Sequence, residues 1–252
     1  MIEIFILSLI QGITEFIPIS SSSHLIIVAE FFNFESKSLA IDVSVHIGSF
    51  LAVIFYFRKE IYNFINNKDL FFKIFFSSLP VIMVGYALVK FNLIDYLRNI
   101  KVIGWTTIIF GILLYISDQF KISKNIKNNF TYKSAVFIGI FQIFSLIPGV
   151  SRSGITISAS RFLNYKRVDS AKISFLLSIP TLAAVSAFGI YNLIYFENIN
   201  FSLINLLSIF FSFLFSLVTI KYFIKYIKNY SLNVFVIYRI ILGLVLLFFA
   251  YL

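Results

Sequence analysis

The chain has 252 residues, of which 60% are hydrophobic and 13% are charged, and its mean hydropathy is +0.94. A soluble domain of this length cannot cover so much apolar surface, so the composition indicates a polytopic membrane protein. The formal net charge is +10, but the basic residues fall in short loops between apolar runs, as membrane topology requires, and do not indicate a nucleic-acid partner. The absence of cysteine excludes disulfides and thiolate metal sites.

Six apolar runs are long enough, or nearly so, to cross a hydrocarbon core of about 30 Å, which takes about 20 helical residues. They cover approximately residues 40–57, 72–90, 101–117, 171–194, 201–222 and 233–252. Two other regions, residues 1–34 and 134–164, each contain about two apolar helices of half that length, joined at a Pro-Ser break. Irregular backbone at membrane depth is tolerated only inside protein or along a cavity. Each pair is therefore expected to enter the membrane and return on the same side.

The order of these elements predicts an internal duplication. A re-entrant pair and three spans occupy about residues 1–117, and the same series recurs in about residues 134–252. Since three spans is an odd number, the second repeat is expected to lie upside down relative to the first, as in inverted-repeat membrane proteins. We therefore expect a single all-α membrane domain of six transmembrane helices plus two re-entrant helix pairs.

The charges of the loops orient this arrangement. Four loops that together hold 14 Lys and Arg residues alternate with three that hold 4. The first set comprises residues 58–73, 118–133, 164–172 and 221–233, and the second comprises residues 33–42, 90–101 and 192–200. The positive-inside rule places the first set in the cytoplasm, so both chain termini and the first re-entrant pair are expected on the outer side. The second pair then enters from the cytoplasm, and the two tips can meet within the membrane.

A polar cluster marks the first break. It reads Gln11-Gly-Ile-Thr-Glu15-Phe-Ile-Pro18-Ile-Ser20-Ser-Ser-Ser23-His24 and follows an apolar run. A carboxylate at bilayer depth costs roughly 2.5–3.5 kcal/mol, so Glu15 is a candidate functional residue. Gln11 and Glu15 share one helix face, and the serines suit the N-cap of the next half-helix. His24 lies in the first turn of that half-helix, either as a functional group or as an ordinary helix-start histidine.

The second break repeats this arrangement. It reads Gln142-Ile-Phe-Ser145-Leu-Ile-Pro148-Gly149-Val-Ser151-Arg152-Ser153-Gly154-Ile-Thr156. Arg152 supplies planar, bidentate donors that match phosphate oxygens, unless it serves only as the buried partner of Glu15. Ser151 or Ser153 can cap the following half-helix, and two half-helix N-termini with free N–H groups form a cradle for an anion. Together the two clusters indicate chemistry on a phosphate-containing substrate.

Other polar residues have simpler interpretations. Arg161 and Arg239 are expected near span ends, where arginine more often extends to the interface or forms ion pairs than catalyses. His46 and Asp42 flank the start of a span and can be interfacial. None of these four residues belongs to the expected site.

At the two clusters the chain resembles the undecaprenyl-diphosphatase family, the bacitracin-resistance type of polyprenyl diphosphate phosphatase. The family's first motif, Glu/Gln-X-X-X-Glu followed by Pro-X-Ser-Ser-X-X-His, is similar to residues 11–24. Its second motif, Pro-Gly-X-Ser-Arg-Ser-Gly-X-Thr, is similar to residues 148–156. Gln11 stands where many members have Glu, and Ser22 and Ser23 replace a frequent Thr-Gly. The similarity spans nearly the whole chain.

The resemblance implies an enzyme of the bacterial cell (inner) membrane that hydrolyses undecaprenyl diphosphate to undecaprenyl phosphate and inorganic phosphate. Such an enzyme recycles the lipid carrier for peptidoglycan synthesis, and its excess confers bacitracin resistance. The resemblance also implies a divalent cation, Mg²⁺ or Ca²⁺, as cofactor and a polyprenyl diphosphate lipid as partner. The alternative function is a lipid-carrier flippase or transporter, because inverted repeats with midplane half-helices suit alternating access equally well.

The expected site draws on both breaks. The catalytic residues are expected to be Glu15, Ser21, His24 and Arg152. The phosphate-binding residues are expected to be Gln11, Ser20, Ser22, Ser151, Ser153, Gly154 and Thr156. Glu15 either ligates the cation or acts as general base, and the nucleophile is Ser21, His24 or water.

Overall fold

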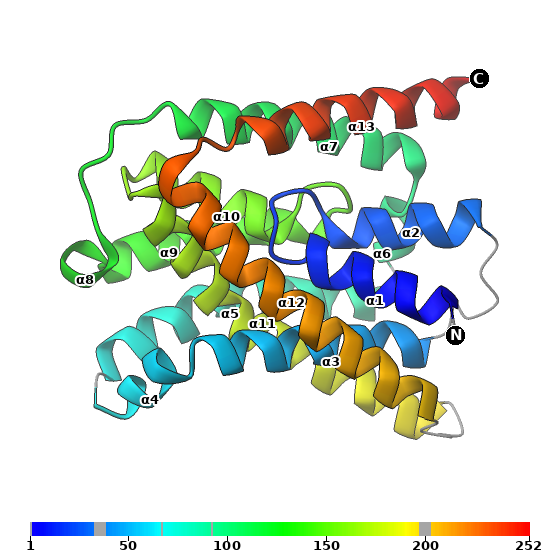
Figure 1. Ribbon diagram of the computed structural model, residues 1–252, viewed down its shortest axis with the longest axis horizontal. Coiled ribbons are helices and arrows are strands. Elements are labelled where there is room, and N and C mark those ends of the chain that lie inside the picture. The colour runs from blue at the N-terminus through cyan, green and yellow to red at the C-terminus, as the bar shows by residue number, and fades with distance from the viewer. Residues whose placement is uncertain (1, 33–38, 67, 92, 197–202) are drawn as a thin grey trace.

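The computed structural model describes residues 2–32, 39–66, 68–91, 93–196 and 203–252, and within them the chain is helical, with no β structure beyond an isolated bridge (Figure 1). Within these residues, six helices have the length and composition to span a membrane, which confirms that prediction. They are α3 (Leu39–Tyr56), α5 (Lys68–Lys90), α7 (Ile100–Asp118), α11 (Arg167–Phe196), α12 (Leu203–Asn229) and α13 (Asn233–Tyr251). The largest difference in bounds is at α12, which continues through a basic segment because a helix need not end where the apolar run ends. The predicted start of that run, residues 201–202, lies outside the described residues.

The two interrupted regions also contain the expected half-length helices. The first has α1 (Ile2–Thr14) and α2 (Ser21–Phe31), and the second has α9 (Tyr132–Gln142), the 3₁₀ turn η1 (Ile143–Leu146) and α10 (Arg152–Phe162). Three short helices lie in the connections: α4 (Arg58–Asn66), α6 (Ile94–Leu97) and α8 (Ile126–Asn129). Helices of 11 to 13 residues are too short to cross a bilayer alone.

The packing of the helices positions the two breaks. In Figure 1, α7 and α13 run side by side along one edge, and α12 crosses α3 on the opposite side. α1 packs on α12, α9 packs on α5, and α10 lies between α7 and α11. The loop between α1 and α2 and the loop before α10 therefore come together in the centre of the molecule.

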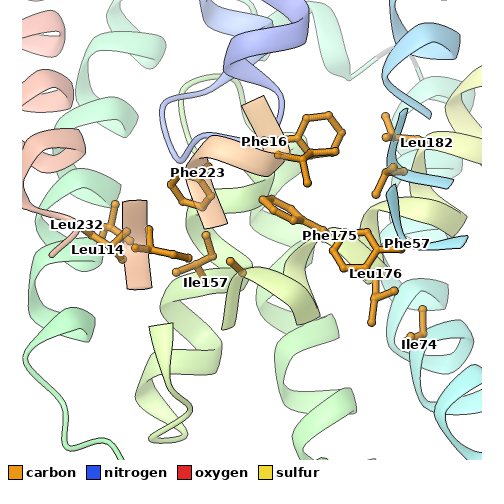
Figure 2. Close-up of a cluster of buried hydrophobic side chains, with 14 of the residues drawn as sticks. Phe16, Phe57, Ile74, Leu114, Ile157, Phe175, Leu176, Leu182, Phe223 and Leu232 are labelled. Carbon is orange, nitrogen blue, oxygen red and sulfur yellow. The ribbon is translucent and has the colours of Figure 1, made fainter. Parts of the chain in front are cut away.

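An aromatic core holds the first break in place (Figure 2). Phe16, which follows the site residue Glu15, is fully buried and meets Phe175 of α11 edge to face, with 5.3 Å between the ring centroids. Phe57 and Phe223 pack around the same ring of α11. Edge-to-face aromatic pairs are worth about 0.5–1.5 kcal/mol beyond the area that they bury. The neighbouring backbone of Glu15 is thus anchored to a span of the other half of the chain.

A seam of small residues brings α3 and α12 into close contact. A Cβ added to Gly48 would lie 2.4 Å from the carbonyl oxygen of Ile209, so only glycine fits there. Next to it, the Ser49 hydroxyl is 3.2 Å from that of Ser212 and 3.0 Å from that of Ser216. Small side chains and interhelical hydrogen bonds are the usual means of helix association in a membrane.

A buried ion cluster joins α7, α10 and α11 away from the breaks. Arg167 binds Asp118 through Nε at 2.7 Å and Nη2 at 2.9 Å. Arg161 is fully buried, lies 3.4 Å from Asp118 and donates to the carbonyl oxygens of Asp118 and Phe120. The pairing role expected for Arg161 is confirmed.

Candidate active site

The first break, between α1 and α2, contains a proline and a residue of unusual backbone conformation. Pro18 has no N–H and its ring crowds a helical carbonyl four residues earlier, which favours the end of α1 here, although α5 and α11 continue through Pro80 and Pro180. Ser20 then adopts a left-handed backbone conformation, with φ of 79°. Such a conformation costs a non-glycine residue about 1–3 kcal/mol and is often found at functional sites. It turns the chain back so that Ser21 begins α2.

The second break has the same parts in a tighter arrangement. Ile147, before Pro148, is extended (φ −84°, ψ 123°), as the proline requires. Gly149 has φ of 93°, and a Cβ there would lie 2.0 Å from the Thr106 hydroxyl, so no other residue fits. Ser151 has φ of 68°, and its Oγ accepts a hydrogen bond of 3.2 Å from the backbone N–H of Gly154. Ser151 is therefore the N-cap of α10.

One arginine holds both breaks together. The Nη1 of Arg239 donates to the carbonyl oxygens of Pro18 at 3.1 Å and Val150 at 3.0 Å. Its Nη2 donates to Gly149 O at 2.8 Å, and its Nε to Thr107 O at 3.2 Å. Arg239 is fully buried and forms no ion pair with the described residues. Its interpretation as an interfacial or ion-pairing residue is wrong, because the carbonyl oxygens freed at the two breaks satisfy its guanidinium instead.

The carboxylate of the first break meets the guanidinium of the second. Glu15 Oε1 lies 3.0 Å from Arg152 Nη2. Its other oxygen, Oε2, accepts hydrogen bonds from the Ser21 hydroxyl at 2.6 Å and from the Gln11 amide at 3.1 Å. Arg152 also donates from Nη1 to Ser174 O at 3.2 Å, while its buried Nε–H has no partner in the described part of the chain. An activated hydroxyl therefore lies beside an arginine that retains an unused donor.

Glu15, Ser21 and Arg152 lie on the wall of a cavity of about 470 Å³. Its predicted polar residues are Glu15, Ser20, Ser21, Ser22, Ser151 and Arg152, and it also includes His46, Gln142, Ser145 and Thr181. The rest of the wall is largely apolar and comes from α5 and α11, with Val81, Ile82, Val89, Leu182, Val185 and Phe188. The cavity is therefore suited to an amphiphile with a compact polar head.

Several predicted site residues hold the breaks and do not line this cavity. Ser153 donates to the carbonyl oxygen of Ile17 at 2.8 Å, which ties α10 to the first break. Thr156 donates to the Ser174 hydroxyl at 2.7 Å. Gly154 donates its N–H to the cap of α10, and its lack of a side chain leaves room for Arg239, whose Nη1 would lie 3.1 Å from an added Cβ. Gln11 approaches the site only through its hydrogen bond to the carboxylate of Glu15.

The two histidines lie where the sequence predicts, in the first turn of α2 and near the start of α3, but they differ in their relation to the cavity. Both ring nitrogens of His24 are engaged, Nδ1 with Ser20 O at 2.6 Å and Nε2 with the Tyr238 hydroxyl at 2.5 Å, and His24 is not part of the cavity wall. His46 does line the cavity, with Nδ1 held 2.7 Å from Asp42 O. Its position in the second turn of α3 was a usable signal, because an ionisable residue within a span is a functional candidate by default.

The donor set limits how a divalent cation can bind. No group of three or more His, Cys, Asp or Glu side chains suited to a metal occurs in the described residues. Glu15 is the one carboxylate among the described wall residues, and both its oxygens already accept hydrogen bonds. These residues fit a cation only if most of its ligands come from a substrate phosphate and water, which is how Mg²⁺ usually binds.

The fold and the site define an integral membrane protein in which two interrupted helix pairs bring a carboxylate, a hydroxyl and a guanidinium to an amphipathic cavity. The chain belongs to the family described as bacitracin resistance protein BacA, which it matches over residues 4–245. It is 50% identical to the protein named undecaprenyl-diphosphatase of Pelagibacter ubique over 99% of this chain and 98% of that one. Proteins of the same name from Jannaschia sp. and Campylobacter curvus are each 39% identical, over 98% of both chains. The resemblance seen in the motifs is confirmed.

Proposed function

We propose that this protein is an undecaprenyl-diphosphate phosphatase, which hydrolyses its lipid substrate to undecaprenyl phosphate and inorganic phosphate. The observation that carries the proposal is the hydrogen bond of 2.6 Å from the Ser21 hydroxyl to Glu15, beside Arg152, on the wall of the cavity. The polar end of the cavity suits a diphosphate, and its apolar wall suits the first prenyl units. The names of relatives that match nearly the whole chain support the same activity.

In this mechanism Ser21 is the nucleophile. Its Oγ attacks the terminal phosphorus while Glu15 accepts the proton, and the bond from that phosphorus to the bridging oxygen breaks. Undecaprenyl phosphate leaves with the electron pair. Water then attacks the phosphoserine and the bond from phosphorus to the Ser21 oxygen breaks, while Glu15 returns its proton to that oxygen and takes one from the water. Inorganic phosphate is released, and Glu15 gives the second proton to solvent, which restores the carboxylate. His24, whose ring nitrogens are both occupied, orients the backbone before Ser21.

Arg152 and the start of α10 stabilise the charge on the transferred phosphoryl group. The Nε–H of Arg152, which has no partner among the described residues, is a donor in place before the substrate binds. Preorganised donors of this kind lower the barrier to phosphoryl transfer because they need no reorganisation during the reaction. When the diphosphate arrives, it competes with Glu15 for Arg152, which leaves Glu15 free to accept the proton of Ser21.

A divalent cation, Mg²⁺ or Ca²⁺, belongs to this proposal as a cofactor shared between protein and substrate. Glu15 is the residue that would hold it, together with phosphate oxygens and water. The ion would neutralise negative charge on the diphosphate. The chemistry of the protein's own residues, as described above, does not depend on which of the two ions is bound.

We further propose that α1–α2 and α9–α10 are re-entrant pairs of two inverted repeats, residues 1–117 and 134–252. The packing supports this, since α1 rests on the second span of the other half, α12, just as α9 rests on α5. A left-handed serine at each break, Ser20 and Ser151, is further support. The proposed location is the bacterial inner membrane, and the loop charges support an orientation in which the active site opens to the outer side.

The test uses the purified protein in a neutral detergent with undecaprenyl diphosphate labelled on its terminal phosphorus. We expect release of labelled inorganic phosphate without any ion gradient, and a trapped phosphoenzyme whose label lies on Ser21. S21A should abolish both, whereas S123A, in an exposed loop, should change neither. If wild-type protein releases no phosphate, the proposed activity is wrong. Label on His24 would refute the assignment of Ser21 as nucleophile.

A further inference from the structure

Gln142 is a buried amide whose hydrogen-bonding capacity the protein leaves unused. It closes α9, is fully buried, and neither its Oε1 nor its Nε2 has a partner in the described part of the chain. An unsatisfied buried polar group costs about 1–3 kcal/mol, and native proteins satisfy nearly all such groups. Gln142 is also part of the wall of the cavity that contains Glu15 and Arg152. A missing partner at this position points to a ligand.

Gln11, the corresponding residue of the first helix pair, has the hydrogen-bond acceptor that Gln142 lacks in the described part of the chain. Gln11 also precedes an Ile-Pro step, and its Nε2 donates 3.1 Å to Glu15, the residue four positions later. Four positions after Gln142 the residue is Leu146, which offers no acceptor. The same amide is thus present at both breaks, but only the first has a carboxylate beside it. An anionic acceptor for the second must come from outside the helix.

The chemistry of the surrounding wall indicates which kind of acceptor. The buried Nε–H of Arg152, on the same wall, is another donor without a partner. Among the described wall residues, Gln142 Nε2 and Arg152 Nε are thus donors without an acceptor, and one of them is cationic, which favours an anionic ligand beside them. A diphosphate has two phosphoryl groups, so the Glu15, Ser21 and Arg152 cluster does not satisfy all of its oxygens. A neutral amide donates to such oxygens without adding a charge that would hold the product in the cavity.

We propose that Gln142 is a substrate-binding residue whose side-chain amide donates a hydrogen bond to a phosphate oxygen of the bound lipid diphosphate. This inference rests on the proposed function and adds to it a binding residue outside the two sequence motifs. The substrate supplies an acceptor for the Nε2 of Gln142, as Glu15 does for the Nε2 of Gln11. In the free protein this amide is buried without a hydrogen-bond partner among the described residues, which lowers the stability of the fold.

The test is Q142L, which removes both polar atoms and keeps an apolar side chain of similar size. Its matched control is Q119L, at the exposed C-cap of α7. A hydrogen bond to a charged group is worth enough for Q142L to raise the KM for undecaprenyl diphosphate by about tenfold or more. We expect kcat to change by less than about threefold, and the thermal midpoint in detergent to stay the same or rise, because an unsatisfied buried amide is gone.

Binding of inorganic diphosphate, measured by calorimetry, separates this inference from the proposed activity because it needs no turnover. Q142L should weaken that binding by the same factor as it raises KM, and Q119L should leave both unchanged. Unchanged KM and unchanged diphosphate affinity in Q142L would overturn the role of Gln142, whatever the wild-type turnover. Suppose instead that the wild-type protein binds diphosphate, that Q142L weakens this binding, and that the lipid is not hydrolysed. This result would refute the proposed activity and support Gln142 as a diphosphate-binding residue.

Discussion

The two interrupted helix pairs have similar sequences at their breaks but hold those breaks differently. In α9–α10, the left-handed Ser151 caps its helix, and residues 153–161 are all buried. In α1–α2, the left-handed Ser20 caps nothing and its Oγ lies 3.0 Å from the Ser23 hydroxyl, while Ser22 is exposed. The second break is a fixed support for Arg152. At the first break, Ser21 begins a helix, α2, whose N-terminus has no side-chain cap.

The first break holds the carboxylate of Glu15 and the second holds the guanidinium of Arg152. Substitution of Arg152 is expected to have the largest effect on kcat. R152K keeps the charge but loses the planar fork that contacts Glu15 and Ser174. Removing a preorganised donor of this kind typically lowers kcat by about 100-fold or more. Phosphate release by the purified variant measures this, with R98K in a loop as the control. Turnover of R152K within threefold of wild type would show that the second break does not bind the reacting phosphoryl group.

The second prediction concerns the residue common to both breaks. R239K replaces a guanidinium that satisfies four carbonyl oxygens with an ammonium that has three donors and a different reach. Breaking a buried charged network of this kind costs about 3 kcal/mol. We expect the free energy of unfolding, from denaturant titration in detergent, to fall by that amount and phosphate release to fall with it. A variant as stable and active as wild type would mean that the two breaks are held in register by other contacts.

The smallest expected effect is a difference in the free energy of unfolding between variants of Ser151 and Ser20. S151A removes the cap of α10 and should lower the free energy of unfolding by about 1 kcal/mol. S20A removes no cap and should lower it by less than about half as much, although both variants keep the left-handed backbone. Thermal unfolding of the two variants side by side provides the measurement. Equal losses would contradict the difference described here between the two breaks.

Local pattern in the sequence was enough to predict the six spans, the two half-length pairs and the meeting of Glu15, Ser21 and Arg152 at one place. Each of these depends on hydropathy or on a short motif, which act over a few residues. The sequence did not predict that Arg239 holds Pro18, because that contact joins residues 221 positions apart. A single arginine within an otherwise apolar α13 was a signal that it has a buried partner.

The residues of the cavity wall could not be predicted from the two motifs either. Its apolar part comes from α5 and α11, and nothing distinguishes Val81 or Leu182 from the lipid-facing residues of the same helices until their packing is known. Gln142 was part of the second cluster, but a glutamine before a proline break does not reveal whether its amide has a partner. The motif predicts phosphate binding for Ser153 and Thr156, because a hydroxyl looks the same in a sequence whether it meets a ligand or, as here, Ile17 O and the Ser174 hydroxyl.

A cavity with a charged end and a hydrocarbon wall has a consequence for handling the protein. Such a space discriminates poorly between its substrate and any single-chain anionic surfactant. Alkyl phosphates and alkyl sulfates used in extraction should therefore behave as competitive inhibitors, whereas uncharged maltosides should not. The same property offers a starting point for inhibitors: a compact anionic head on a short, branched hydrocarbon chain.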